Sequence, residues 1–200
     1  MAKLALNKSS LNRESRRLKA FRQFVPALDL KRKQILAARQ TSRKLIGEQE
    51  SALSAIAEQV REQLPMLAES GLDLHELVQI GKVELDRVNL VGIELPVLSK
   101  VEIDRHQHSR LALPAWVDTA LDLAEQRLQL ELRCRVERER LMRLDAALRK
   151  TTQRLNLFDK VLIPRAENHI RRIRIALSDA ERAGVVRAKI AKGKRLRAVS

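Results

Sequence analysis

Apolar residues recur at steps of three and four near both ends of the chain, which predicts two long helices that each bury one narrow stripe. The first stripe keeps its register from Leu11 to Val60, and ten of its sixteen positions are apolar. A register sustained over this length is typical of a coiled coil rather than of an ordinary surface helix. Its apolar members are Leu11, Leu18, Phe21, Val25, Leu28, Ile35, Ile46, Leu53, Ile56 and Val60.

The second stripe lies in the last third of the chain, on a helix predicted to begin near Trp116, just after Pro114. Between Leu162 and Ile170 its spacing becomes four plus four, and Pro164 lies at that point. Such a stutter predicts a kink and a local unwinding of a left-handed supercoil. The apolar members are Leu141, Leu144, Leu148, Leu155, Phe158, Leu162, Ile170, Ile173 and Leu177. We call the two stripes together the seam.

Two features disturb the first stripe. Pro26 lacks a backbone N–H, so it either kinks the helix or marks a new helix start. Between Arg32 and Gln49 the seam positions are mostly polar. This stretch indicates either a loosened, partly solvated patch or a docking face for another subunit. We expect the first helix to end near Pro65 and Gly71.

The period changes between the two helices. Asp73 to Val78 is compatible with a short helix, whereas Val83–Leu90 and Val97–Ile103 are spaced as strands around Gly92, with Pro96 opening the return. A hairpin this short needs a helix to pack on. We therefore expect a mainly α fold, a long antiparallel two-helix coiled coil with a small insertion that contains a β-hairpin. Its regions are 1–70, 71–113 and 114–200, the last with a basic tail.

Composition supports this architecture and narrows the function. Charged residues make up 32% and aromatic residues only 2%, as in long coiled-coil helices. The net charge of +15 indicates an anionic partner: nucleic acid, a membrane surface or an acidic protein surface. The basic residues lack interleaved aromatic rings, so the stacking platform of single-strand binders is missing. No stretch approaches the roughly 18 apolar residues of a membrane span, and we expect a soluble, cytoplasmic protein without membrane insertion.

Motifs that carry chemistry are missing from the sequence. It contains no phosphate-binding glycine loop, so no direct nucleotide contact is expected, and no serine nucleophile motif. Cys134 is the one cysteine, and His106 and His108 have no carboxylate or thiol set around them. Glu137, Glu139 and Asp145 fall on helix faces predicted to be solvated. We expect no catalytic residue, no cofactor and no metal site.

The stretch around the stutter carries a distinctive set of residues. They are Asn156, Phe158, Val161, Ile163, Pro164, Arg165, Glu167, Asn168 and Ile170. Their spacing is similar to the C-terminal signature of the D subunit of the V-type (vacuolar and archaeal type) ATPases. Leu28 to Lys33 and Asn89 to Pro96 resemble two further segments of that family, in the same order.

This resemblance implies a non-catalytic rotor shaft of an ion-translocating ATPase, for example one that transports hydrogen ions. Such a shaft inserts its coiled coil into the ring of catalytic A and B subunits and carries the F subunit. Its other end rests on the subunit that couples to the membrane ring, on the cytoplasmic face. Charges expected to face the A and B ring are Arg171, Arg172, Arg174, Arg182, Arg187 and Lys189. The hairpin is expected to contact the F subunit or the ring.

Two other interpretations stay open on the sequence. The charge is compatible with a coiled-coil protein associated with nucleic acid or the ribosome, which predicts steeply salt-dependent binding. A secretion-system stalk or a chaperone coiled coil would share the long helices. Neither of these requires the signature around Pro164.

Overall fold

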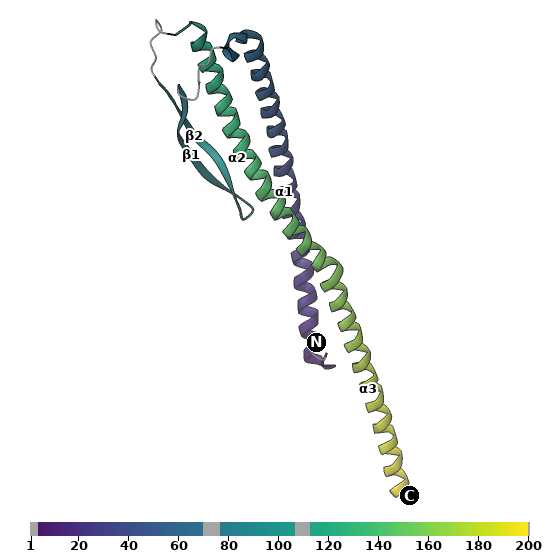
Figure 1. Cartoon of the computed structure of the whole chain (residues 1–200). Helices are drawn as coiled ribbons and strands as arrows, with labels where there is room; N and C mark the ends of the chain where they lie inside the picture. The colour runs from purple at the N-terminus through teal and green to yellow at the C-terminus, as the bar shows by residue number, and fades with distance from the viewer. Residues whose placement is uncertain (1–3, 70–76, 107–112, 200) are drawn as a thin grey trace. The chain divides into compact units, whose positions relative to one another are not determined.

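A computed structural model describes residues 4–69, 77–106 and 113–199 of the chain (Figure 1). The predicted mainly helical fold, with a hairpin inserted between two long helices, is confirmed. The chain divides into a terminal unit, residues 1–31 with 151–200, and a central unit, residues 32–150, which are described separately below. The elements in chain order are helix α1 (Lys8–Gln63), 3-10 helix η1 (Pro65–Ala68), strands β1 (Val78–Leu90) and β2 (Ile93–Arg105), helix α2 (Trp116–Leu157), π-helical turn η3 (Phe158–Leu162) and helix α3 (Ile163–Val199).

Helix α1 begins and ends at recognisable signals. The Asn7 side chain accepts a hydrogen bond of 2.8 Å from the amide of Ser10, which satisfies one of the free donors at the helix start. Pro26 lies inside α1, and the helix is continuous through it, so the alternative of a new helix start at Pro26 is wrong. The helix ends at Gln63 because the following proline, Pro65, disfavours helical geometry at Leu64.

The central unit pairs α1 and α2 in opposite directions (Figure 1). Arg39 Nε lies 2.5 Å from Asp145 Oδ1, and Arg138 Nη2 lies 2.6 Å from Glu50 Oε1. The position on α2 therefore decreases as the position on α1 increases, which is the antiparallel arrangement that the sequence predicted. These pairs are at least partly exposed and add little stability by themselves.

The hairpin packs on the part of the seam that is polar in sequence. Leu95 of β2 is buried together with Ile35 of α1 and Leu144 of α2, and Leu90 and Ile93 pack around this cluster. The stretch between Arg32 and Gln49 thus does contain a docking face, but the chain's own hairpin occupies it.

The hairpin itself is longer than predicted. Val78, expected at the end of a short helix, is the first residue of β1, and Pro96 lies inside β2, opposite Arg87, rather than opening it. Proline is tolerated there because a strand in a two-stranded hairpin has one unpaired edge. The rest of the predicted helix from Asp73 lies largely outside the described residues.

A two-residue turn joins the strands. Val91 and Gly92 have φ angles of 52° and 79°, which is the left-handed geometry of a type I′ turn. The Asn89 side chain accepts a 2.7 Å hydrogen bond from the Gly92 amide and holds the turn closed. A β-branched residue in this conformation is strained, so the turn is maintained by the paired strands and not by Val91.

The terminal unit is held by aromatic and aliphatic contacts between α1 and the α2–α3 helix. The Phe158 ring lies 5.5 Å from the Phe21 ring and 6.1 Å from the Phe24 ring, measured between centroids. Farther along α3, Ile170 and Ile173 are buried. All nineteen residues predicted for the seam, in both units, lie buried or half-buried in the structure.

Replacing Leu144 with alanine tests the packing of the hairpin against the helix pair. Leu144 is fully buried, so the variant should lose about 2–5 kcal/mol of unfolding free energy in urea titration. Met142 lies two residues earlier on α2 and is 64% exposed, so Met142→Ala is the matched control, with an effect within about 0.5 kcal/mol. Equal losses in the two variants would contradict the assigned core.

Candidate functional site

The terminal unit carries a groove between α1 and α3 with a volume of about 840 Å³, which we call the basic groove. Its lining combines four cations, one carboxylate and three branched aliphatic side chains. These residues are Ser15, Leu18, Lys19, Arg22, Gln23, Glu167, Ile170, Arg171, Arg174 and Ile175.

Helical spacing places the groove residues on one side of each helix. Glu167, Arg171 and Arg174 follow one another at steps of four and three, and Leu18 and Arg22 are four apart on α1. The seam brings these two helix faces together. The groove lies directly beside the seam, because the buried seam residue Ile170 is part of its lining.

One carboxylate partly neutralises the groove. Arg22 Nη2 donates a 2.7 Å hydrogen bond to Glu167 Oε1. Within the described part of the chain, Lys19, Arg171 and Arg174 make no ion pair. The groove thus presents excess positive charge beside apolar side chains, which suits an acidic protein segment with some apolar residues.

The structure divides the six charges expected to contact a ring. Arg171 and Arg174 line the basic groove, whereas Arg172, Arg182, Arg187 and Lys189 are exposed on α3 outside its lining. Sequence reasoning missed Lys19 and Arg22. In the sequence, Lys19 and Arg22 lie next to and one helical turn after the seam residue Leu18. Only the pairing of α1 with α3 shows that they share a groove with Arg171 and Arg174.

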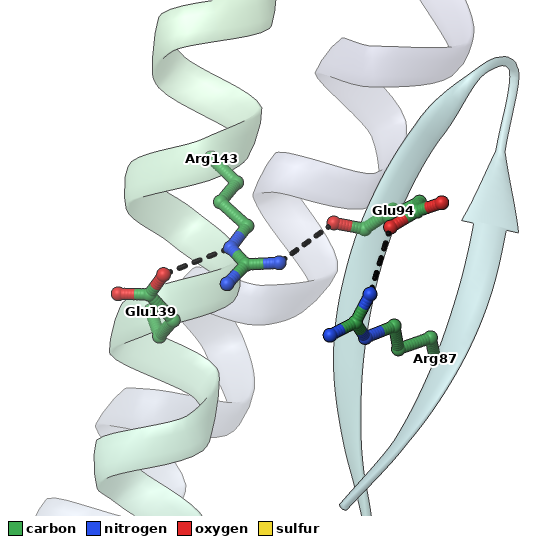
Figure 2. A network of polar contacts seen from close by, with 4 residues as sticks. All are labelled: Arg87, Glu94, Glu139 and Arg143. Atoms are coloured by element: carbon green, nitrogen blue, oxygen red, sulfur yellow. Dashed lines mark hydrogen bonds and ion pairs between the residues drawn. The ribbon is translucent and has the colours of Figure 1, made fainter.

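A second candidate surface is the hairpin of the central unit, which Arg143 joins to α2 near the turn (Figure 2). The Arg143 side chain points from α2 to the strand, where its Nη1 donates a 3.1 Å hydrogen bond to the backbone oxygen of Glu94. Glu139 Oε1 accepts a 2.8 Å hydrogen bond from Arg143 Nε and fixes its orientation. Arg87 Nη1 lies 3.4 Å from Glu94 Oε2 within the hairpin.

The other end of the hairpin has a similar tie. Arg105, the last residue of β2, donates a hydrogen bond to Asp122 and lies 3.8 Å from Glu125 Oε2. The hydrogen bond to Asp122 is the main reason that the pKa of Arg105 is raised. Arg105 therefore carries its positive charge throughout the neutral pH range.

A polar cavity separates the two ties. It has a volume of about 390 Å³ and lies among β2, α1 and α2, with Gln49, Val97, Glu137 and Arg140 in its lining. Arg140 Nη1 donates a 3.0 Å hydrogen bond to Glu137 Oε1. On either side of this cavity, buried apolar clusters join the hairpin to the helices, around Leu95 near the turn and around Val78 at the start of β1.

The outer strand leaves apolar side chains uncovered. Ile80, Val83, Leu85 and Val88 of β1 are between 36 and 55% exposed. An exposed apolar set on an edge strand is typical of a protein contact surface.

The described residues contain no cluster of three or more metal-ligating side chains. Within the same residues, every helix falls short of the apolar length that a membrane crossing needs.

Comparison with known proteins identifies the family. The family model for the D subunit of ATP synthase matches residues 10–193, which include the hairpin, α2 and most of α1 and α3. The chain belongs to the ATP synthase D-subunit family. Among its relatives, the V-type ATP synthase D subunit of Borreliella burgdorferi is 29% identical over 195 residues, with 96% of this chain and 95% of the relative covered. The V-type ATP synthase D subunit of Chlamydia caviae is 31% identical over 199 residues, with 96% and 94% covered.

The D-subunit signature predicted from sequence now has a structural context. Ile163 closes the π turn by donating its amide hydrogen to the carbonyl of Phe158, and Pro164 follows at once. Glu167 pairs with Arg22 across the groove. Asn156 and Asn168 are exposed. Of the signature residues, Ile163, Pro164 and Glu167 therefore lie at or beside the junction between η3 and α3.

Replacing Arg143 with alanine should loosen the end of the hairpin near its turn. The lost hydrogen bond lies at the surface, so the expected cost is about 1 kcal/mol or less. Hydrogen exchange of the Leu90 and Ile93 amides should become faster, while exchange in α2 stays unchanged. Arg87→Ala is the control, because Arg87 contacts Glu94 only within the hairpin. Equal exchange in both variants would contradict the role of Arg143.

Proposed function

We propose that this chain is the central-stalk rotor subunit of a V-type ATPase or ATP synthase. It transmits torque between ATP hydrolysis or synthesis in the ring of catalytic A and B subunits and ion translocation through the membrane ring. The observation that carries the proposal is the match to the D-subunit family over residues 10–193. The relatives named as D subunits of V-type ATP synthases align with this chain over nearly their whole length.

The paired helices suit the transmission of torque. A single polar helix bends easily, whereas two helices joined along a buried seam resist bending and twisting together. The two paired helices also carry different side chains on their surfaces. Inside a ring of three A–B pairs, the helix pair would therefore present a different face to each A–B pair. The rotor thus acts by biasing catalytic sites that belong to other subunits and is itself not catalytic.

The basic groove is the surface that we assign to the A and B subunits, together with Arg172, Arg182, Arg187 and Lys189. Acidic patches of the ring would meet these charges as the stalk turns. Exposed ion pairs are individually weak and screened by salt. A surface that must leave one partner and reach the next needs contacts of this kind.

The exposed apolar edge of β1 is assigned to the F subunit or to the ring. Its apolar residues Ile80, Val83, Leu85 and Val88 favour a lasting contact more than a sliding one. The stalk would couple at its far end to the subunit on the membrane ring, which places the protein at the cytoplasmic face of the membrane as a peripheral subunit. The alternative of nucleic-acid or ribosome association rests on net charge alone.

Co-purification tests the assignment directly. A tagged form of the full chain, expressed in its own host, should recover A, B and F subunits in stoichiometric amounts. Recovery of ribosomes or nucleic acid in their place would contradict the proposed function.

Charge reversal tests the basic groove. Arg171→Glu with Arg174→Glu should weaken binding to the assembled A and B ring on the order of tenfold, through loss of attraction and new repulsion. The ratio of ions transported to ATP hydrolysed should fall as well. Arg149→Glu with Lys150→Glu is the control, since both residues are exposed and the net charge changes equally. Unchanged binding and coupling in the groove variant would remove the groove from the ring contact.

A further inference from the structure

The π turn η3 interrupts an otherwise α-helical run between α2 and α3. The amide of Ile163 bonds to the carbonyl of Phe158, five residues earlier, instead of to a carbonyl four residues earlier. Such turns are rare, occur as single insertions inside α-helices and are frequent at functional positions. η3 ends at Leu162, where the stretch predicted to have an irregular supercoil begins.

The heptad count gives the reason for the irregularity. Leu177 lies 22 positions after Leu155, one more than three heptads, whereas Leu11, Leu18 and Val25 on α1 are spaced by seven. The α2–α3 helix therefore holds one residue more than its partner requires in this part of the seam. A five-residue turn takes up such a residue, because it turns the chain once with more residues than an α turn.

Burial downstream of η3 agrees with this count. A strict heptad continuation from Leu155 and Phe158 would direct Arg165 and Arg172 into the seam. Both are exposed, and Ala166 and Ile173, each one position later, are buried. The π turn thus keeps two arginines out of the seam.

Two neighbouring features favour the π form over a regular helix. Pro164 has no N–H, so a regular α-helix would leave the carbonyl of Lys160 without its donor here. Phe158, the first residue of η3, packs against Phe21 and Phe24, so all three phenylalanines of the chain meet at this turn. The rings therefore lie against the turn at which the α2–α3 helix is irregular.

We propose that η3 is a built-in torsional hinge of the stalk: it stores one extra residue and lets the α2–α3 helix change its twist without opening the seam. This inference rests on the proposed function. A sequence shorter by one residue in η3 could form a regular α-helix with an unbroken heptad register. Deleting an exposed residue of η3 would restore the heptad spacing and bring the half-buried Ile163 into the seam in place of Leu162. A hinge at this point would explain why the chain carries the less regular turn.

The decisive variant is a deletion of Lys160, an exposed residue of η3. If η3 stores an extra residue, this deletion should convert the π turn into α-helix, leave the melting temperature equal or higher, and slow hydrogen exchange of the Ile163 amide. Deletion of Arg135, an exposed residue in regular α2, is the matched control. It should lower the melting temperature by at least about 5 °C, because seam residues after it turn away from α1. Equal destabilisation by both deletions would overturn the storage of an extra residue.

The hinge itself is tested in the assembled ATPase. The Lys160 deletion should assemble normally but lose coupling of ATP hydrolysis to ion transport, whereas Lys160→Ala, which keeps the register, should retain it. Full coupling by the deletion variant would overturn the hinge. Failure of both the wild-type chain and Lys160→Ala to assemble with the A and B subunits would instead overturn the stalk assignment. The melting and exchange results would still decide the role of η3 in the register.

Discussion

The structure depends on one narrow apolar seam that neither long helix can bury alone. With few aromatic residues in the sequence, the seam is filled mostly by leucine, isoleucine, valine and alanine, which leave the remaining helix faces free for charge. Each unit uses the same solution, two antiparallel faces closed on each other. The positions of the ion pairs, the basic groove and the aromatic cluster all follow from which faces the seam brings together.

The hairpin compensates for the weakest part of this seam. Between Arg32 and Gln49 polar residues replace aliphatic ones, and Leu95 adds a third apolar contribution to Ile35 and Leu144 there. The arginine ties at Arg143 and Arg105 then hold the hairpin at both ends, with a polar cavity between them. The same element can thus stabilise the helix pair through β2 and leave apolar side chains of its edge strand β1 exposed to a partner.

Periodicity in the sequence was sufficient for the helices, the hairpin, its turn at Gly92 and the antiparallel closure, because these follow from local residue spacing. Strand ends were missed, since Val78 and Pro96 pair through contacts that local propensity does not contain. Only part of the basic groove was predicted from the sequence. Arg171 and Arg174 were named as exposed charges, whereas Lys19 and Arg22 come close to them only because α1 packs against α3. The four-plus-four spacing from Leu162 to Ile170 indicated an irregularity, but the π turn lies directly before it, at Phe158–Leu162, because backbone hydrogen bonding and not side-chain spacing decides where the helix widens.

The burial of Cys134 has a practical consequence. It is the one cysteine in the chain and is only 2% exposed on α2 of the central unit. Buried thiols in structural positions react slowly with labelling reagents. A cysteine placed on any exposed helix face would therefore be the preferred attachment point for a fluorophore, a bead or a cross-linker. The native sequence is therefore suited to site-specific labelling for measurements of subunit rotation, without prior removal of a reactive cysteine.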